Sequence, residues 1–154
     1  MSDPATFLPA PEHLRERLAR DRNVWLCTLR ADGSPHVVPV WFVHLRERWW
    51  IGVSTASVKV RNALRDPRVS LALEDGDAPV VAQGLASVHD RFPADVLAAF
   101  QDRYAWDPRT PYGRDPRRSL LEIGVTRWLM AGAAPETTPI SETAPLSEDR
   151  PHPT

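Results

Sequence analysis

The chain has 154 residues, a length that fits one domain and leaves little room for a second complete core. Hydrophobic residues make up 42% and charged residues 25% of it, which is typical of a packed globular protein. The 19 basic and 20 acidic side chains give a formal net charge of -1, so the composition argues against a dedicated nucleic-acid binder and against binding to an anionic membrane.

Cys27 is the only cysteine, which excludes an internal disulfide and a cysteine-based zinc site within one chain. No stretch approaches the roughly 18 to 20 continuous apolar residues of a membrane-spanning helix. The first residues, MSDPATFLPAPEH, lack the basic and apolar segments of a signal peptide. We therefore expect a cytoplasmic protein in a reducing environment.

The first half of the chain is predicted to hold one short helix followed by three strands. Residues 1–10 contain two prolines and little apolar pattern, so we expect a flexible lead-in. Pro11 suits the first turn of a helix over about 11–21, in which Leu14 and Leu18 lie one turn apart. The strands are expected to form a meander whose first hairpin turns at Asp32-Gly33, with strand positions at about 24–30, 35–44 and 49–54.

The second half is predicted to contain two helices and three further strands. Ser57 can cap a short helix that stops before Pro67, and a second helix stacks apolar residues at intervals of four, namely Val96, Phe100 and Tyr104. The strands are expected at about 68–74, 80–89 and 118–130. Residues 133–154 are rich in Pro, Ser and Glu and are expected to be a disordered tail, which leaves one domain over 11–132.

Six strands with hairpin connections and a few small helices favour a mainly β fold, a closed antiparallel barrel, over an open α/β sheet. The interior of such a small barrel is filled by side chains. A ligand must therefore bind outside the barrel, typically at a dimer interface.

A phosphate-binding environment is predicted at the turn from strand to helix in STASVKVRN, residues 54–62. The first turn of a helix exposes unpaired backbone N–H groups and positive dipole charge. Ser54, Thr55 and Ser57 add hydroxyl groups there, and Lys59 and Arg61 add cations that bind phosphate through charge-assisted hydrogen bonds. The alternative is a solvated helix start with a capping serine.

Pro39 lies in the middle of the second predicted strand and cannot donate to a sheet ladder. This predicts a sheet edge, a bulge or a neighbour that is not a strand. Backbone groups near Val40 and Trp41 would then be free to bind the edge of a planar heterocycle, unless the edge is simply exposed. Trp41 and Trp128 are also candidates for stacking on a ring.

Other kinds of site are not supported by the sequence. His13, His36, His44 and His89 show no ligand spacing, so no metal site is expected. No GxSxG, P-loop or GxGxxG motif is present, which argues against conventional hydrolases. No catalytic acid or base is assigned.

The ordered succession of four segments closely resembles the pyridoxamine 5'-phosphate oxidase-like split-barrel family. These segments are TLRADGSPHVVPVWFV, STASVKVRNALRDPRVSLALED, VVAQGLASV and LLEIGVTRWLM. The likeness covers about residues 12–131, and more narrowly it looks like the actinobacterial branch of F420-dependent, or deazaflavin-dependent, reductases. The resemblance implies a six-stranded antiparallel split β-barrel that forms a homodimer, with flavin or deazaflavin sites at the subunit interface.

The resemblance also implies where a cofactor would lie on this chain. The isoalloxazine-like ring would lie along Val38, Pro39, Val40 and Trp41. Ser54 and Thr55 would border the ribityl chain, and the phosphate would be surrounded by Ser57, Lys59, Arg61 and Asn62. Flavin-binding members often have an adjacent arginine-lysine pair after the serine, whereas Val58 precedes Lys59 here, and this departure favours the deazaflavin over FMN.

These observations lead to a cytoplasmic homodimeric oxidoreductase that binds F420 and transfers a hydride to a small conjugated or apolar substrate. An alternative keeps the site and replaces F420 with FMN, giving a flavoprotein reductase or oxidase. Another is a non-catalytic split-barrel module that binds a cofactor or haem. Haem would need an axial ligand such as His36, His44 or His89.

Overall fold

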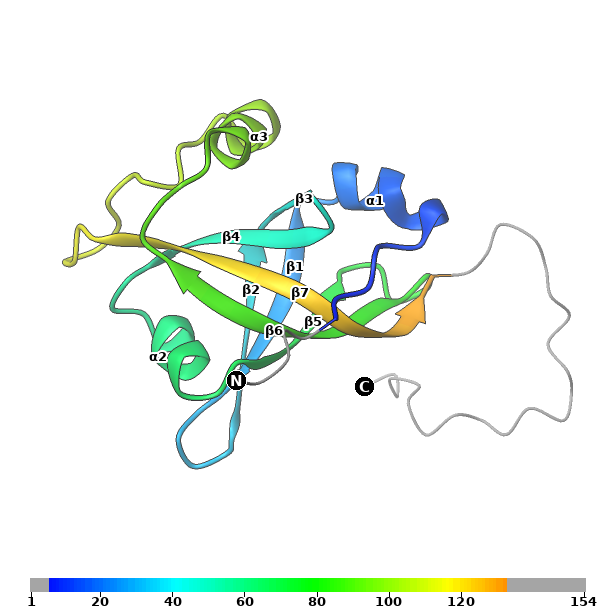
Figure 1. Ribbon diagram of the computed structural model, residues 1–154, viewed down its shortest axis with the longest axis horizontal. Coiled ribbons are helices and arrows are strands. Elements are labelled where there is room, and N and C mark those ends of the chain that lie inside the picture. Colours follow the sequence, from blue (N-terminus) through cyan, green and yellow to red (C-terminus); the bar gives the residue numbers. More distant parts are fainter. Residues whose placement is uncertain (1–5, 133–154) are drawn as a thin grey trace, which may run out of the picture.

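The computed structural model describes residues 6–132, which form a mainly β protein with small helices (Figure 1). The helical segments are η1 (Glu12–Leu14), α1 (Arg15–Arg20), α2 (Val58–Arg65) and α3 (Ala94–Tyr104). The strands are β1 (Asn23–Leu29), β2 (Pro35–Trp41), β3 (Val43–Leu45), β4 (Arg48–Ser54), β5 (Arg68–Leu73), β6 (Val80–His89) and β7 (Arg118–Ala131). The predicted order of elements is confirmed, and the helix expected at 11–21 is a 3₁₀ turn followed by a short α-helix.

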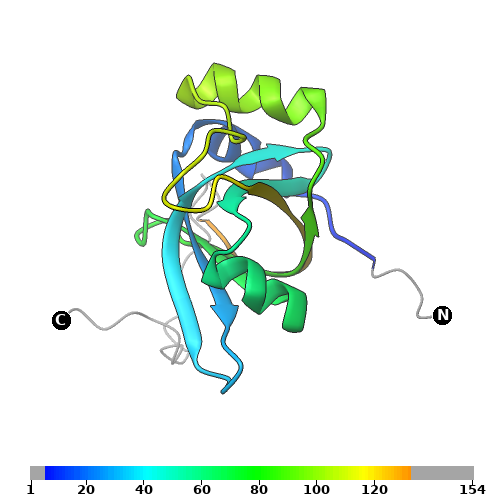
Figure 2. The ribbon, with the colours of Figure 1, turned by 90° about the vertical axis from the view of Figure 1, so that its left-hand side faces the viewer.

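All seven strands pair antiparallel in one sheet, in the order β2-β1-β5-β6-β7-β4-β3. Figure 2 shows the sheet curled into a barrel shape, with α3 and α2 on opposite sides of it. The hairpin between β1 and β2 turns at Gly33, whose φ of 84° is the positive value predicted for this turn. The prediction of a mainly β split barrel is thus confirmed, and the sheet is curled with β2 and β3 as its end strands.

The predicted meander of the first three strands is confirmed, with a break in its middle strand: residues 35–41 pair with β1 and residues 43–45 pair with β4. Phe42 interrupts the strand expected at 35–44, so that β2 lies at one end of the sheet order and β3 at the other. This interruption raises the strand number from six to seven. Strand β2 pairs with β1, while β4 pairs with β3 and β7. Hydrophobic periodicity marks a strand but does not reveal a break of one residue within it, so the interruption at Phe42 was not predicted.

Two hydrophobic clusters cover the two faces of β4. Trp49 is 1% exposed and packs in the barrel interior with Phe42, whose ring centroid is 4.8 Å away. Trp50 is 3% exposed and belongs to a second cluster beneath α3, which includes Phe100 and Tyr104. Because both faces of β4 are covered, the strand lacks the alternation of polar and apolar residues seen in half-exposed strands.

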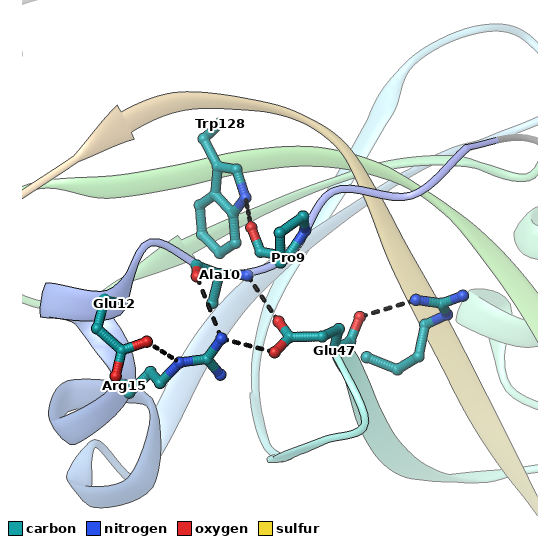
Figure 3. Close-up of polar contacts among 7 residues, drawn as sticks. Pro9, Ala10, Glu12, Arg15, Glu47 and Trp128 are labelled. Atoms are coloured by element: carbon teal, nitrogen blue, oxygen red, sulfur yellow. Dashed lines mark hydrogen bonds and ion pairs between the residues drawn. The ribbon is translucent and has the colours of Figure 1, made fainter.

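Residues 6–10, the described part of the lead-in expected at 1–10, are hydrogen-bonded to the barrel. Figure 3 shows that the indole Nε1 of Trp128 donates to the carbonyl oxygen of Pro9 at 3.1 Å. The backbone N–H of Ala10 donates to Oε2 of Glu47 at 2.7 Å, and Arg15 pairs with the other oxygen of that carboxylate at 2.7 Å. Residues 1–5 and the predicted tail at 133–154 lie outside the described residues.

Within residues 6–132, no helix has the length and apolar composition needed to cross a membrane. The same part of the chain contains no group of three or more His, Cys, Asp or Glu side chains placed to hold a metal ion.

Candidate cofactor site

The turn from β4 into α2 forms the predicted capped helix start. The hydroxyl of Ser57 accepts a hydrogen bond from the backbone N–H of Val60 at 3.3 Å, and the N–H of Ser57 donates to the carbonyl of Ser54 at 3.0 Å. The first turn of α2 contains no acidic residue. Its positive dipole end is therefore not neutralised by a side chain of the helix itself.

Lys59 and Arg118 lie close together beside this turn, and we refer to them as the cation pair. Both side chains are partly buried, and loss of solvation lowers the pKa of each from its ordinary value. The positive charge of Arg118 lowers the pKa of Lys59 further. Among residues 6–132, neither side chain forms a salt bridge with a carboxylate. Two partly desolvated like charges without a counterion favour binding of an anion.

Arg118 is fixed by two hydrogen bonds. Its Nη1 donates to the hydroxyl of Ser54 at 3.0 Å, and its Nε donates to the carbonyl of Pro108 at 2.9 Å. Sequence reasoning missed this residue. Arg118 reaches the site because Ser54 and Arg118 are directly opposed in the β4–β7 ladder, although 64 positions separate them in the chain.

Thr55 and Asn62 use their side chains within the fold. The hydroxyl of Thr55 is 2.7 Å from that of the buried Ser119, and this contact joins the ends of β4 and β7. Asn62 is only 3% exposed; its Nδ2 donates to the hydroxyl of Thr28 at 2.9 Å and its Oδ1 accepts from Arg65 at 2.8 Å. The structure thus turns Asn62 inward, whereas the sequence reading expected it beside a phosphate.

Arg61 is exposed on α2, and no side-chain hydrogen bond or ion pair engages it within the described part of the chain. The imidazole of His36 lies near Lys59. Its pKa is lowered from the ordinary value, mainly by burial, then by the positive charge of Arg30 and then by that of Lys59. Its Nδ1 is buried without a hydrogen-bond partner. The cation pair therefore has a neutral imidazole as a further polar neighbour.

The edge position predicted from Pro39 is confirmed, because β2 is the terminal strand of the sheet. The hairpin bond from Arg30 N to Ser34 O sets the hydrogen-bond alternation along β1 and β2. By that alternation Val38 and Val40 bond to β1, while Pro39 and Trp41 direct their backbone groups to the free edge. The missing N–H of Pro39 therefore costs no ladder bond, and Trp41 offers a free N–H and carbonyl where Val40 does not.

The side chain of Trp41 belongs to an aromatic cluster with Tyr104 and Trp106. The rings of Trp41 and Tyr104 are stacked with centroids 4.7 Å apart and an interplanar angle of 13°. Trp106 meets Trp41 edge-on at 5.5 Å. The guanidinium of Arg118 lies 5.7 Å from the centroid of Trp106, so this ring connects the aromatic cluster to the cation pair.

The loop that carries Trp106 is packed closely onto β4. A Cβ on Gly52 would come within 2.7 Å of Pro108 Cβ and 3.0 Å of the Trp106 ring, so only glycine lets the loop approach this strand. Trp128, the other candidate for ring stacking, bonds to Pro9 and lies 6.4 Å from the Trp49 ring. Trp128 thus contributes to packing of the barrel.

The histidines considered as haem ligands occupy three different strands with separate neighbours. His36 is beside the cation pair, and His44 lies edge-on to Trp49 at 5.6 Å. His89 bonds through Nε2 to the Glu122 carboxylate at 2.7 Å. A surface groove of about 490 Å³ lies elsewhere, on the outer face of the sheet, lined by residues that include Cys27, Ser70 and Leu85.

Comparisons with known proteins show the family and the fold of the chain. The family model described as pyridoxamine 5'-phosphate oxidase matches residues 10–131. An F420H(2)-dependent biliverdin reductase of Mycobacterium tuberculosis is 37% identical over 106 residues, which cover 68% of this chain and 75% of that protein. A solved F420 reductase superposes with a TM-score of 0.63 at 24% identity, covering 77% of this chain and 98% of its own. A conserved hypothetical protein of Mycobacterium tuberculosis gives a TM-score of 0.66 at 24% identity, over 94% and 100% of the two chains.

Proposed function

The chain belongs to the pyridoxamine 5'-phosphate oxidase family and is an oxidoreductase, and on this basis we propose that it uses reduced F420 to reduce a small conjugated molecule. The observation that carries the proposal is the cation pair of Lys59 and Arg118, which has no counterion and lies beside the first turn of α2. The proposal includes a cytoplasmic homodimer as the active form.

The residues present fit the phosphate of such a cofactor. A phosphate oxygen would replace the missing counterion of the cation pair, and backbone N–H groups at the start of α2 add donors. Ser54 and Ser57 supply hydroxyls at the same turn, while Arg61 is positioned on the exposed side of the helix. We assign the phosphate to Ser54, Ser57, Lys59 and Arg118, with Thr55 holding the strand ends in place.

The ring of the cofactor is assigned to the free edge of β2. Pro39 and Trp41 direct backbone groups to that edge, and Trp106 connects it to the cation pair. A bound F420 would supply the hydride, and the chain's task is to hold the ring and the substrate in a fixed relative orientation. Because the relative of known name reduces biliverdin, a conjugated tetrapyrrole is the first substrate to test.

A homodimer is supported by apolar side chains on the outer face of β1 and β2. Trp25 is 43% exposed and Val37 is 52% exposed on this face. Aromatic and aliphatic side chains on an open sheet face are typical of a surface that a second subunit covers. Sedimentation at micromolar concentration should give twice the chain mass of 17.3 kDa.

The cofactor assignment is tested by titrating cofactor-free protein with F420 and, separately, with FMN, following cofactor fluorescence. We expect F420 to bind in the micromolar range or tighter and FMN to bind weakly. The Lys59→Ala variant should lose affinity, whereas Arg127→Ala, which removes an exposed cation of β7, should not. The reverse preference would make the protein a flavoprotein, and binding of neither cofactor would overturn the proposed function.

A further inference from the structure

The aromatic cluster presents a ring that is open to ligands and held from behind. Trp41 is 39% exposed, and its neighbours Tyr104 and Trp106 contact it at 4.7 and 5.5 Å. The Tyr104 hydroxyl accepts a hydrogen bond from the backbone N–H of Phe42 at 3.1 Å, which fixes the tyrosine ring. Trp41 therefore has a rigid backing on one side and solvent on another. Such a ring can stack on a flat conjugated molecule without further reorganisation.

An arginine without a counterion stands beside this ring. The guanidinium carbon of Arg22 lies 4.9 Å from the Tyr104 centroid and 5.7 Å from the Trp41 centroid. Its Nη1 donates to the carbonyl of Arg103 at 3.3 Å. Arg22 forms no salt bridge with any carboxylate of residues 6–132. Its contacts with the two rings hold the guanidinium in place and leave N–H donors for an acceptor from outside.

The charges around Arg22 do not offset it. Arg103 shares the Tyr104 ring with Arg22, since its guanidinium lies 5.5 Å from the centroid of that ring, and its charge adds to that of Arg22. Asp21, the acidic neighbour in sequence, forms salt bridges with two other arginines. Its carboxylate oxygens lie 3.8 Å from Nε of Arg17 and 3.6 Å from Nε of Arg20. This end of the aromatic cluster is therefore positively charged and next to a stacking surface.

We infer that Arg22 binds a carboxylate of the substrate while Trp41 stacks on its conjugated system. The inference rests on the proposed function, because Trp106 joins this surface to the cation pair assigned to the cofactor. It narrows the substrate class to planar conjugated acids. Neutral conjugated molecules can stack on Trp41 but lack the group that Arg22 recognises.

The direct test measures binding without turnover. Biliverdin, which carries carboxylates, and its dimethyl ester, which does not, are titrated into the wild type and the Arg22→Gln variant, following the absorbance of the pigment. The wild type should bind the acid about tenfold more tightly than the ester, since one charge-assisted hydrogen bond at an exposed site is worth about that factor. The Arg22→Gln variant should bind both forms equally, with the affinity that the wild type has for the ester.

Controls separate recognition of the carboxylate from damage to the fold. Arg20→Gln removes a neighbouring side chain that is 65% exposed and should bind the acid as the wild type does. Arg22→Lys keeps the charge and should recover part of the preference. If Arg22→Gln weakens binding of the acid and of the ester to the same extent, or changes the binding of neither, the inference is overturned. Titration with F420 in the same variants tests the proposed function separately, because Arg22 should not affect it.

Discussion

The phenolic oxygen of Tyr104 lies 3.1 Å from the backbone nitrogen and 2.7 Å from the backbone oxygen of Phe42. Phe42 is the residue at which the chain leaves β2 and starts β3, so its polar groups lie outside both ladders. It is fully buried, with 0% exposure. Tyr104 therefore supplies the hydrogen bonds that a strand would otherwise supply.

Removing this hydroxyl should destabilise the protein without changing its core volume. Tyr104→Phe leaves the N–H and carbonyl of the buried Phe42 without this partner, which costs about 1 to 3 kcal/mol. Urea denaturation measures the loss. Tyr112→Phe is the matched control, because Tyr112 is 77% exposed and its hydroxyl is free to bond to water. Equal stability of the two variants would contradict the role given to Tyr104.

We expect the cation pair to contribute more to the affinity for F420 than to the stability of the fold. Lys59→Ala and Arg118→Ala are each expected to weaken F420 by about tenfold or more, the worth of one charge-assisted hydrogen bond. Thermal unfolding of the free Lys59→Ala variant should be unchanged or slightly improved, because removal of one cation relieves repulsion from the other. A large loss of stability with unchanged cofactor affinity would show that Lys59 is structural.

Acidification should destabilise the fold through His44. Burial lowers the pKa of its imidazole to about 4, against an ordinary value of 6.5. Between these values the unfolded chain binds a proton that the folded chain does not, so stability falls as the pH falls from about 6.5 to about 4. The shift corresponds to about 3 kcal/mol. The urea midpoint of a His44→Phe variant should decrease less over this interval than that of the wild type, and parallel decreases would exclude His44 as the cause.

Gly124 should be sensitive to the smallest side chain. A Cβ at this position would lie 2.4 Å from the ring of Phe7, so Gly124→Ala forces the N-terminal segment away from β7. Overpacking of this kind costs about 1 to 3 kcal/mol. Limited proteolysis should then cut the variant within residues 6–10. Adding Phe7→Ala removes the obstacle and should return the double variant to the stability of Phe7→Ala alone.

The sequence predicted the elements well because each carries a local signal. Ser57 caps α2 as expected, and Gly33 has the positive φ required by its hairpin. The break at Phe42 was not predicted, because the hydrogen bonds of its backbone come from the hydroxyl of Tyr104, 62 residues away. In the cofactor site, too, residues with a local sequence signal were predicted and residues brought in by distant pairing were not. Lys59 was found from its helix start, whereas Arg118 enters only through the β4–β7 register.

The split of residues 35–45 at Phe42 has a consequence for how the protein folds. Strands β2 and β3 are neighbours in the chain, yet they occupy the two ends of the sheet order. The sheet between them is closed only after β5, β6 and β7, which come later in the chain, have found their partners. Such dependence on distant pairings slows folding to about milliseconds to seconds. We therefore expect slow refolding in stopped-flow experiments, because the sheet is complete only when β7 has paired with both β4 and β6.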